Sequence, residues 1–169
     1  GHLYAYQHYN VVPDILTSAK GLGGGFPIGA MLAKEAWAQV FQPGTHGTTF
    51  GGNPLAATVA NAVLAHLDAP LLAGVGERHA LIVDQLNALS ARYDAFSAVR
   101  GAGLLIGAEL AGPLRGKAKT LTNLAAEEGV IALIAGPDVL RFAPALNIPL
   151  ADIAEAFVRL DRAVARLTR

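Results

Sequence analysis

The sequence predicts a mixed α/β fold, and three observations support this prediction. Two short apolar segments, residues 15–19 and 28–33, flank a glycine-rich turn, as two neighbouring strands would. From about residue 70 onward, segments with apolar residues at helical spacing alternate with strand-like runs. Hydrophobic residues make up 53% of the 169 residues, which is enough to build a core. We therefore expect an ordered globular chain that contains both helices and sheets.

The charge and cysteine content exclude several classes of protein. The 13 basic and 13 acidic side chains balance to zero, so no positive field favours binding to a nucleic-acid backbone. Charged residues make up only 15% of the chain, against about 25% in an average globular protein, and such an apolar chain is not typical of disorder. Because there is no cysteine, the chain is not a disulfide scaffold, a thiolate zinc site or a thiol enzyme.

One long stretch carries no charge, because no Asp, Glu, Lys or Arg occurs between Glu35 and Asp68. Glycines and prolines interrupt it, and no apolar run approaches the roughly 18 residues of a membrane span. Asn53 is a suitable N-cap and Pro54 a suitable first-turn residue for a helix over residues 53–67. A helix without a charged face is typical of a protein core, but a subunit interface would favour the same composition. Both interpretations stay open.

After this stretch, charged residues return and the pattern becomes regular. We expect residues 1–70 to be part of something larger and residues 71–169 to form a compact α+β unit. The expected elements of that unit are a helix over 70–92, a segment at 96–100 leading into a strand over 103–110, a helix over 117–128 ending at Gly129, a β-like segment at 130–135, a turn at 136–138, a strand over 139–143 and a terminal helix over 152–166.

Lys20 ends the first predicted strand and is followed by four glycines in five residues. Glycines carry no side chain, so a ligand can approach the backbone closely. A lysine desolvated in such a place could act as a nucleophile or as a Schiff-base amine. A P-loop fits poorly, since its lysine follows the glycines. The alternative is a glycine-rich loop with a solvated lysine.

The segment GTHGTTFGGNP, residues 44–54, opens the uncharged helix. Hydroxyl and backbone N–H groups in front of a helix N-terminus suit an anion such as phosphate. Thr48 and Thr49 are the candidate donors, and His46 could line the same site. The alternative is a segment that only turns the chain and caps the helix.

Arg141 is flanked by apolar residues of a predicted strand and therefore needs a partner. A carboxylate, bound in bidentate fashion, is the natural partner and could come from the protein or from a substrate. A structural ion pair explains the pattern equally well.

The segment that begins Gly101-Ala-Gly103 approaches a dinucleotide-binding fingerprint without matching it. Its third glycine comes one place late, and a strand is expected where that fingerprint requires a helix. We therefore reject nucleotide binding there. The five histidines show no spacing typical of a metal site, so no metal ligand is assigned.

Taken together, these segments resemble the class III pyridoxal-phosphate aminotransferases, in particular the acetylornithine and succinylornithine aminotransferases. The resemblance extends from Gly1 to the last helix, and its long motifs occur in the family's order. The motifs read LYAYQHY and PDILTSAKGLGGGFP within residues 3–27, HGTTFGGNPL at 46–55, and VRGAGLLIG and IAGPDVLRFAP within 99–144.

The resemblance implies the pyridoxal-phosphate-dependent transferase fold of type I. Residues 1–70 would be the carboxyl-terminal part of its large, cofactor-binding domain, and residues 71–169 would be its small carboxyl-terminal α+β domain.

The resemblance also implies a role for each candidate residue. Lys20 would carry the Schiff base to pyridoxal 5'-phosphate and would move the proton during amino transfer. Thr49 would bind the phosphate of the neighbouring subunit's cofactor, and Thr48 would lie beside the substrate in that shared site. Arg141 would bind a carboxylate of the amino or oxo acid.

The reaction implied is transfer of the δ-amino group of N-acetylornithine or N-succinylornithine to 2-oxoglutarate, in arginine metabolism. The enzyme would be a cytoplasmic homodimer that binds neither nucleic acid nor membrane. Ornithine or 4-aminobutyrate transamination is an alternative within the family. A further alternative is a truncated, non-catalytic fragment that only associates with other subunits.

The family's amino-terminal motifs have no counterpart here. These are a phosphate-binding loop, an aromatic that stacks on the cofactor ring, an aspartate for the pyridinium nitrogen and an arginine for the substrate. Asp14 cannot replace that aspartate, because it belongs to the lysine segment. The chain starts at Gly1 and its only methionine is Met31, so we expect residues upstream. We also expect the chain alone to have little or no activity, to expose apolar surface and to associate.

Overall fold

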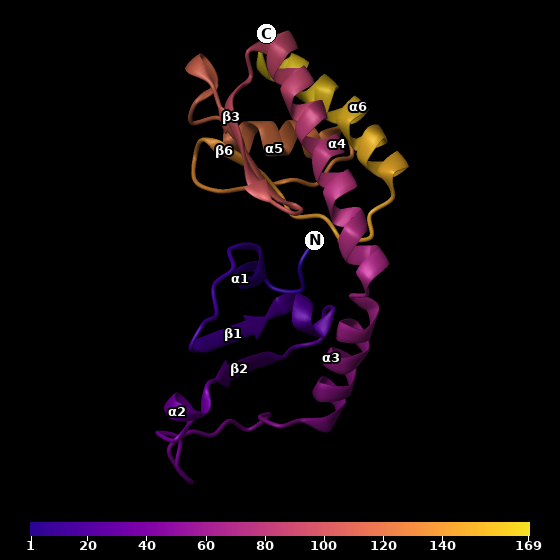
Figure 1. Ribbon diagram of the computed structural model, residues 1–169. Coiled ribbons are helices and arrows are strands. Elements are labelled where there is room, and N and C mark those ends of the chain that lie inside the picture. Colours follow the sequence, from indigo (N-terminus) through magenta and orange to yellow (C-terminus); the bar gives the residue numbers. More distant parts are fainter. The chain divides into compact units, whose positions relative to one another are not determined.

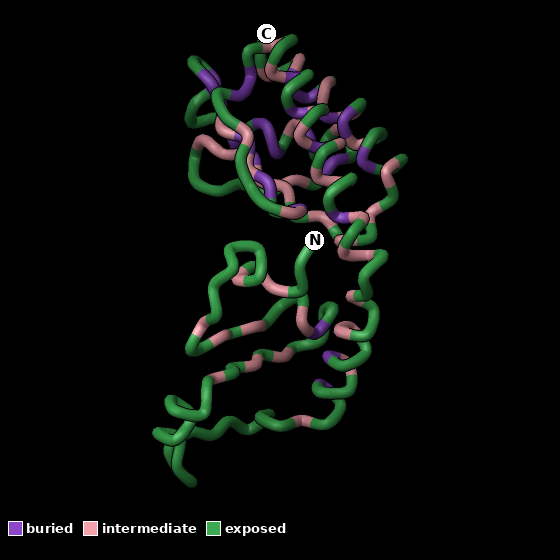
Figure 2. The backbone as a smooth tube through the Cα atoms, viewed as in Figure 1, coloured by how far each residue is buried: buried purple, intermediate pink, exposed green.

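The computed structural model describes all 169 residues, and the chain divides into two compact units, His2–Leu72 and Ala73–Arg169. Figure 1 shows the elements of both, and Figure 2 shows that most buried residues belong to the second unit. The assignment of the two units to parts of a larger transferase fold stays a prediction.

The first unit contains a two-stranded antiparallel sheet, β1 (Ile15–Ala19) and β2 (Gly29–Ala33). Ile15 lies opposite Ala33 and Ala19 lies opposite Gly29, so the chain turns back through the glycine-rich segment. A short 3-10 helix, η1 (Lys20–Gly23), begins that turn directly after β1. Both predicted strands are therefore confirmed.

Helix α3 (Pro54–His66) begins as the sequence predicts. The Asn53 side-chain oxygen accepts a hydrogen bond of 3.0 Å from the Ala56 N–H, which satisfies one free donor of the first turn. Only Ala56 and Ala60 of the helix are buried. Within this chain the helix is therefore not buried on all sides, and the two interpretations of its uncharged surface, a core and a subunit interface, stay predictions. Two single-turn helices, α1 (Ala5–His8) and α2 (Glu35–Ala38), complete the unit.

The second unit is built on a four-stranded antiparallel sheet in the order β3-β4-β6-β5. Its strands are β3 (Phe96–Ala102), β4 (Leu105–Leu110), β5 (Leu133–Ile134) and β6 (Val139–Phe142). The predicted strands over 103–110 and 139–143 are confirmed within two residues at each end. The β-like segment at 130–135 forms only the two-residue strand β5.

Strands β3 and β4 form a hairpin whose turn depends on glycine. Gly101 has φ +146° and Gly103 has φ +55°, both on the side of φ that other residues rarely adopt. A Cβ on Gly101 would collide with the backbone carbonyl of Leu105. These glycines therefore serve the hairpin, and a strand follows them, as the sequence predicts, where a dinucleotide fingerprint would require a helix.

Three helices pack on one face of this sheet, α4 (Ala69–Tyr93), α5 (Ala118–Glu127) and α6 (Leu150–Leu167). The predicted helices over 70–92, 117–128 and 152–166 are confirmed, and Gly129 follows α5 with φ +86°. A one-turn 3-10 helix, η2 (Gly112–Leu114), links β4 to α5. The core lies between the inward faces of the three helices and alternate residues of the strands. Its fully buried large side chains are Leu86, Ile106, Leu110, Leu121, Leu140, Leu160 and Val164.

Only one face of the sheet is covered in this way. Ile106, Ala108 and Leu140 point into the core, so the residues that alternate with them point to the opposite face. No helix of the unit packs on that opposite face, which carries partly or fully exposed residues on each strand. No single helix of the chain is long and apolar enough to cross a membrane, and α3 and α4 meet the length and composition criteria only when taken as a pair.

Candidate functional site

Lys20 lies where β1 ends and η1 begins, so the hairpin fixes its backbone. Its φ of +54° is in the left-handed region, which a side chain with a Cβ seldom adopts. Such backbone conformations gather at functional sites, where the surrounding structure maintains them. The side chain is exposed. The desolvated lysine that the sequence favours is therefore not found in this chain taken alone.

The glycines after Lys20 have two different roles. A Cβ on Gly23 would lie 2.8 Å from the Ile28 side chain, and one on Gly24 would lie 3.0 Å from Val63 of α3, so the loop packs closely against its own strand and against the helix. Gly21 and Gly25 have no atom within 4 Å of a Cβ position. The loop is thus anchored on one side and leaves open space on the other.

Thr48 and Thr49 belong to an irregular, exposed segment in front of α3. A turn closes here, since the Gly51 N–H donates to the Thr48 carbonyl at 3.3 Å. A Cβ on Gly51 would lie 2.6 Å from Thr48 Oγ1, so the absence of a side chain at Gly51 leaves this hydroxyl its place. Asn53, not a threonine, caps α3. An anion bound at this segment would therefore use the threonine hydroxyls and the turn more than the capped helix end.

The surroundings of the two threonines are unusually apolar for an exposed segment. The Phe50 side chain is 81% exposed, and Leu55 of the first helical turn is also exposed. His46 lies edge-on to Phe41, with ring centroids 6.5 Å apart, and has no metal-ligating neighbours. Exposed apolar surface beside polar groups is typical of a binding surface.

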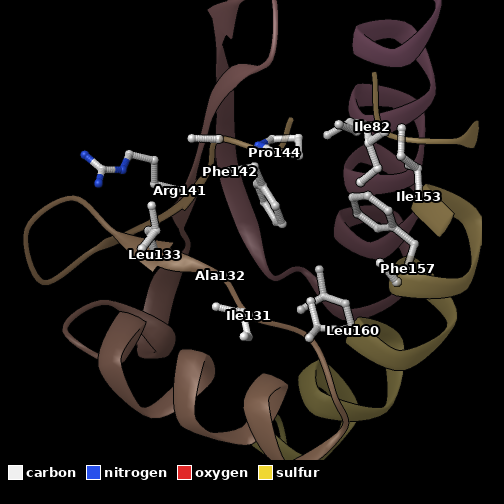
Figure 3. Close-up of a pocket in the computed structure, with 14 residues that line it drawn as sticks. Ile82, Ile131, Ala132, Leu133, Arg141, Phe142, Pro144, Ile153, Phe157 and Leu160 are labelled. Carbon is white, nitrogen blue, oxygen red and sulfur yellow. The ribbon is translucent and has the colours of Figure 1, made fainter. Parts of the chain in front are cut away.

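Arg141 lies on β6, opposite Gly107 of β4 on one side and Leu133 of β5 on the other. Its Nε is buried, but no acceptor in the chain bonds to it. A shielded donor without an acceptor costs free energy, and a charged one costs more. Figure 3 shows that its guanidinium group points away from Ile153 and Phe157, which lie toward the helices. The structural ion pair considered from the sequence is not present.

An apolar cavity of about 270 Å³ lies between the sheet and the helices of the second unit. Phe142 and Pro144 border it from the strand side, and Phe157 and Leu160 border it from α6 (Figure 3). Arg141 contributes to its edge, while its charged end points elsewhere. The cavity therefore offers mainly apolar surface, and Arg141 is the only polar side chain of its lining.

Asp14 is engaged in a local ion pair. Lys34 Nζ donates to its carboxylate at 2.8 Å, and the Lys34 N–H donates to the Asp14 carbonyl at 3.0 Å. The hydrogen bond from Lys34 holds the pKa of the Asp14 carboxyl below its usual value. The pair closes the open end of the β1–β2 hairpin and leaves Asp14 no role at Lys20.

The candidate residues divide between the two units. Lys20, Thr48 and Thr49 lie in the first unit, where the lysine loop packs on α3 and the threonine segment leads into the same helix. Arg141 lies in the second unit. No three side chains of the His, Asp or Glu type come together in a way that could bind a metal ion. Sequence reasoning missed the cross-strand neighbours of Arg141, because the register of β4 against β6 cannot be inferred from either strand alone.

Comparison with known families gives a match over nearly the whole chain. The family model for aminotransferase class-III matches residues 1–164. The succinylornithine transaminase of Photorhabdus laumondii is 69% identical over 167 residues, which covers 98% of this chain and 42% of that protein. The acetylornithine aminotransferase of Pseudomonas putida is 55% identical and is covered to the same 42%. The chain thus spans about two fifths of the length of these relatives.

Solved structures give the same result. The N-acetylornithine aminotransferase of Stenotrophomonas maltophilia superposes with a TM-score of 0.89 at 42% identity, over 97% of this chain and 43% of that one. The acetylornithine aminotransferase of Elizabethkingia anophelis superposes with a TM-score of 0.88 at 32% identity, over 98% of this chain and 44% of that one.

Proposed function

This chain belongs to the class-III aminotransferases, and from that premise we propose that it forms part of a pyridoxal-phosphate-dependent transaminase. The enzyme would move the δ-amino group of N-acetylornithine or N-succinylornithine to 2-oxoglutarate. The observation that carries this proposal is 69% identity to a succinylornithine transaminase across 98% of the chain. Because the chain spans about two fifths of such relatives, the activity is proposed for the protein that contains it.

The lysine loop fits the proposed cofactor. Pyridoxal phosphate, when bound, would supply an electron sink for the bonds around the amino-bearing carbon. Lys20 offers a primary amine at a fixed backbone position, and Gly21 and Gly25 leave open space next to it. We assign to Lys20 the covalent attachment of the cofactor and the proton movement at the reacting carbon, since one amine at this place can hold and return a proton.

The threonine segment fits a phosphate and a second subunit. The Thr49 hydroxyl would donate a hydrogen bond to the phosphate, and Thr48 would lie beside the substrate. Both side chains are exposed, and so is the apolar surface of Phe50 next to them. This exposure supports a homodimer in which each subunit contributes the segment to its neighbour's site. The cytoplasmic location and the place in arginine metabolism belong to the same proposal.

Arg141 would bind a carboxylate of the amino or oxo acid. The support is its buried Nε, which lacks an acceptor within the chain. A carboxylate accepts from an arginine through two parallel hydrogen bonds and would satisfy this donor.

A chimera tests the function. Residues 1–169 would replace the matching segment of the Photorhabdus laumondii enzyme, and amino transfer to 2-oxoglutarate would be measured with N-acetylornithine, N-succinylornithine, ornithine and 4-aminobutyrate. We expect activity with the two N-acylated ornithines and little with the others. Lys20→Ala should abolish it, and borohydride reduction followed by peptide mapping should find the pyridoxyl group on Lys20 only in the unsubstituted chimera. A folded chimera that binds the cofactor elsewhere would contradict the assignment.

The alternatives predict other results in the same assay. Ornithine aminotransferases occur among the similar solved structures, at 29–32% identity. Preference for free ornithine would therefore favour that reaction. A folded but inactive chimera would favour a non-catalytic fragment.

A further inference from the structure

Helix α3 lies against the loop that Lys20 begins, within the first unit (Figure 1). Its buried and half-buried residues Ala56, Ala60 and Val63 recur at spacings of four and three, so they share one face of the helix. Val63 of that face reaches the loop, since a Cβ on Gly24 would lie 3.0 Å from Val63 Cγ2. The helix therefore meets the loop through one side chain that packs directly on the backbone of a glycine.

Gly24 ends the 3-10 helix that Lys20 begins. Its N–H donates to the Gly21 carbonyl at 3.1 Å, and its φ of +55° is in the left-handed region that favours glycine. The Phe26 N–H donates to the Gly23 carbonyl at 2.9 Å, which closes a second, overlapping turn. The loop is thus one hydrogen-bonded piece of chain, so a contact at Gly24 also restrains the backbone of Lys20.

The backbone of Lys20 needs such a restraint. Its φ of +54° is a conformation that a residue with a Cβ keeps only where the surrounding structure maintains it. On the strand side, the pairing of β1 with β2 extends to Ala19 and Gly29. On the loop side, the contact between Val63 and Gly24 comes from outside the hairpin. Lys20 therefore lies between two supports, one from the sheet and one from α3.

We propose that Val63 is a positioning residue for Lys20. Its side chain lies against Gly24 and holds the loop, so that the Lys20 amine keeps one place from turnover to turnover. The importance of that place rests on the proposed function, in which Lys20 binds the cofactor and moves the proton. Val63 acts through the loop and needs no contact with cofactor or substrate. Because proton transfer depends steeply on geometry, a displaced lysine lowers the rate more than it weakens substrate binding.

Hydrogen exchange, read by mass spectrometry, tests the hold on the loop without any catalysis. It is measured on the 169-residue chain and on the chimera without cofactor. Val63→Ala removes both methyl groups from the contact. We expect the loop peptide, residues 20–28, to exchange about tenfold faster in this variant, while β1 and β2 keep their rates. Equal exchange of the loop in Val63→Ala and in the unsubstituted protein would overturn the proposal.

Three further variants separate positioning from a general loss of packing. Val63→Thr keeps a branched side chain of nearly the same size and should restore slow exchange of the loop. Leu64→Ala is the matched control, because Leu64 is also half-buried but points about 100° further round α3. It should leave the loop unchanged. Gly24→Ala disturbs the same contact from the loop side and should speed exchange there, even if Val63→Ala does not fold. Equally fast exchange of the loop in Val63→Ala and Leu64→Ala would contradict the proposal.

The chimera separates this proposal from the function on which it rests. In an active chimera, Val63→Ala should lower kcat about tenfold and leave KM for 2-oxoglutarate unchanged, and Val63→Thr should recover kcat. An active chimera in which Val63→Ala loosens the loop without lowering kcat would overturn the positioning role alone. An inactive chimera whose loop still responds to Val63→Ala would overturn the function and support the hold of Val63 on the loop.

Discussion

Arg78 Nε donates a hydrogen bond of 2.7 Å to the backbone carbonyl of Ile148. This bond joins α4 to the loop that follows β6, the strand that carries Arg141. One residue further along α4, His79 Nδ1 lies 2.7 Å from the carbonyl of Gly103 in the β3–β4 turn. Because the start of β4 lies opposite the end of β6, both contacts are at one end of the sheet, and one turn of α4 thus holds that end, including the end of the strand on which Arg141 lies.

Two glycines of α4 provide a test of this contact. Glycine inside a helix costs about 0.5–1 kcal/mol relative to alanine, so Gly76→Ala, where a Cβ would meet nothing, should stabilise the unit by that amount. A Cβ on Gly74 would collide with the Arg78 guanidinium group. Gly74→Ala should therefore give no gain or a loss of stability, measured by urea unfolding.

The double variant Gly74→Ala/Arg78→Ala completes the cycle. Arg78→Ala alone should destabilise by about 1–3 kcal/mol, because the Ile148 carbonyl loses a charged donor. In the Arg78→Ala background, Gly74→Ala should stabilise the unit by the same amount as Gly76→Ala. The reason is that no guanidinium group then occupies the position of the new Cβ. A stabilising Gly74→Ala in the unsubstituted chain would show that Arg78 does not need the space.

The ion pairs of Glu128 predict a dependence of stability on pH. Arg162 Nε and Arg166 Nη1 donate to its carboxylate at 2.7 and 3.1 Å, joining the end of α5 to α6. The hydrogen bond from Arg162, followed by that from Arg166, lowers the pKa of Glu128 from its usual 4.5. A carboxyl with a lower pKa in the folded state stabilises the protein above its unfolded-state pKa, and this contribution is lost as pH falls through the folded-state value.

Glu128→Gln should therefore be less stable than the unsubstituted chain at pH 7, and the difference should shrink below pH 4.5. Urea unfolding at a series of pH values measures it. Glu77→Gln, on an exposed part of α4, is the matched control and should leave the stability at pH 7 close to that of the unsubstituted chain. If the difference in the free energy of unfolding between Glu128→Gln and the unsubstituted chain stayed the same at low pH, the charge of Glu128 would contribute nothing to stability.

The fold of the second unit could be predicted closely from the sequence. The apolar spacing of α4 and α6 and the glycine after α5 defined helices that the structure contains almost to the residue. The one-turn helices α1 and α2 were not predicted, since four residues are too few to show a period. Strand β5 is shorter than expected, since only Leu133 and Ile134 of the apolar segment pair with β6, and Ile131, though apolar, is 93% exposed.

The candidate site was predictable as a set of residues but not as an arrangement. Lys20 and Arg141 stand out by their neighbours in sequence, and their proposed roles stay predictions. The absence of charge on α3 indicated that something apolar lies against it, but composition does not say whether that is the same chain or another. The position of Arg141 opposite Gly107 could not be predicted at all, because it arises from the register of β4 against β6.

The surface around Phe50 predicts self-association. Its ring is largely exposed, and Leu55 is exposed beside it. Burying such side chains between two copies would be favourable, at about 1.5–3 kcal/mol for each large side chain. Phe50→Ser should therefore weaken association about tenfold or more in sedimentation equilibrium.

A second exposed apolar residue distinguishes a specific interface at Phe50 and Leu55 from non-specific hydrophobic association. Val158 is exposed on α6, in the other unit, so Val158→Ser removes apolar surface elsewhere. It should leave association unchanged. Equal effects of the two substitutions would contradict an interface at the threonine segment.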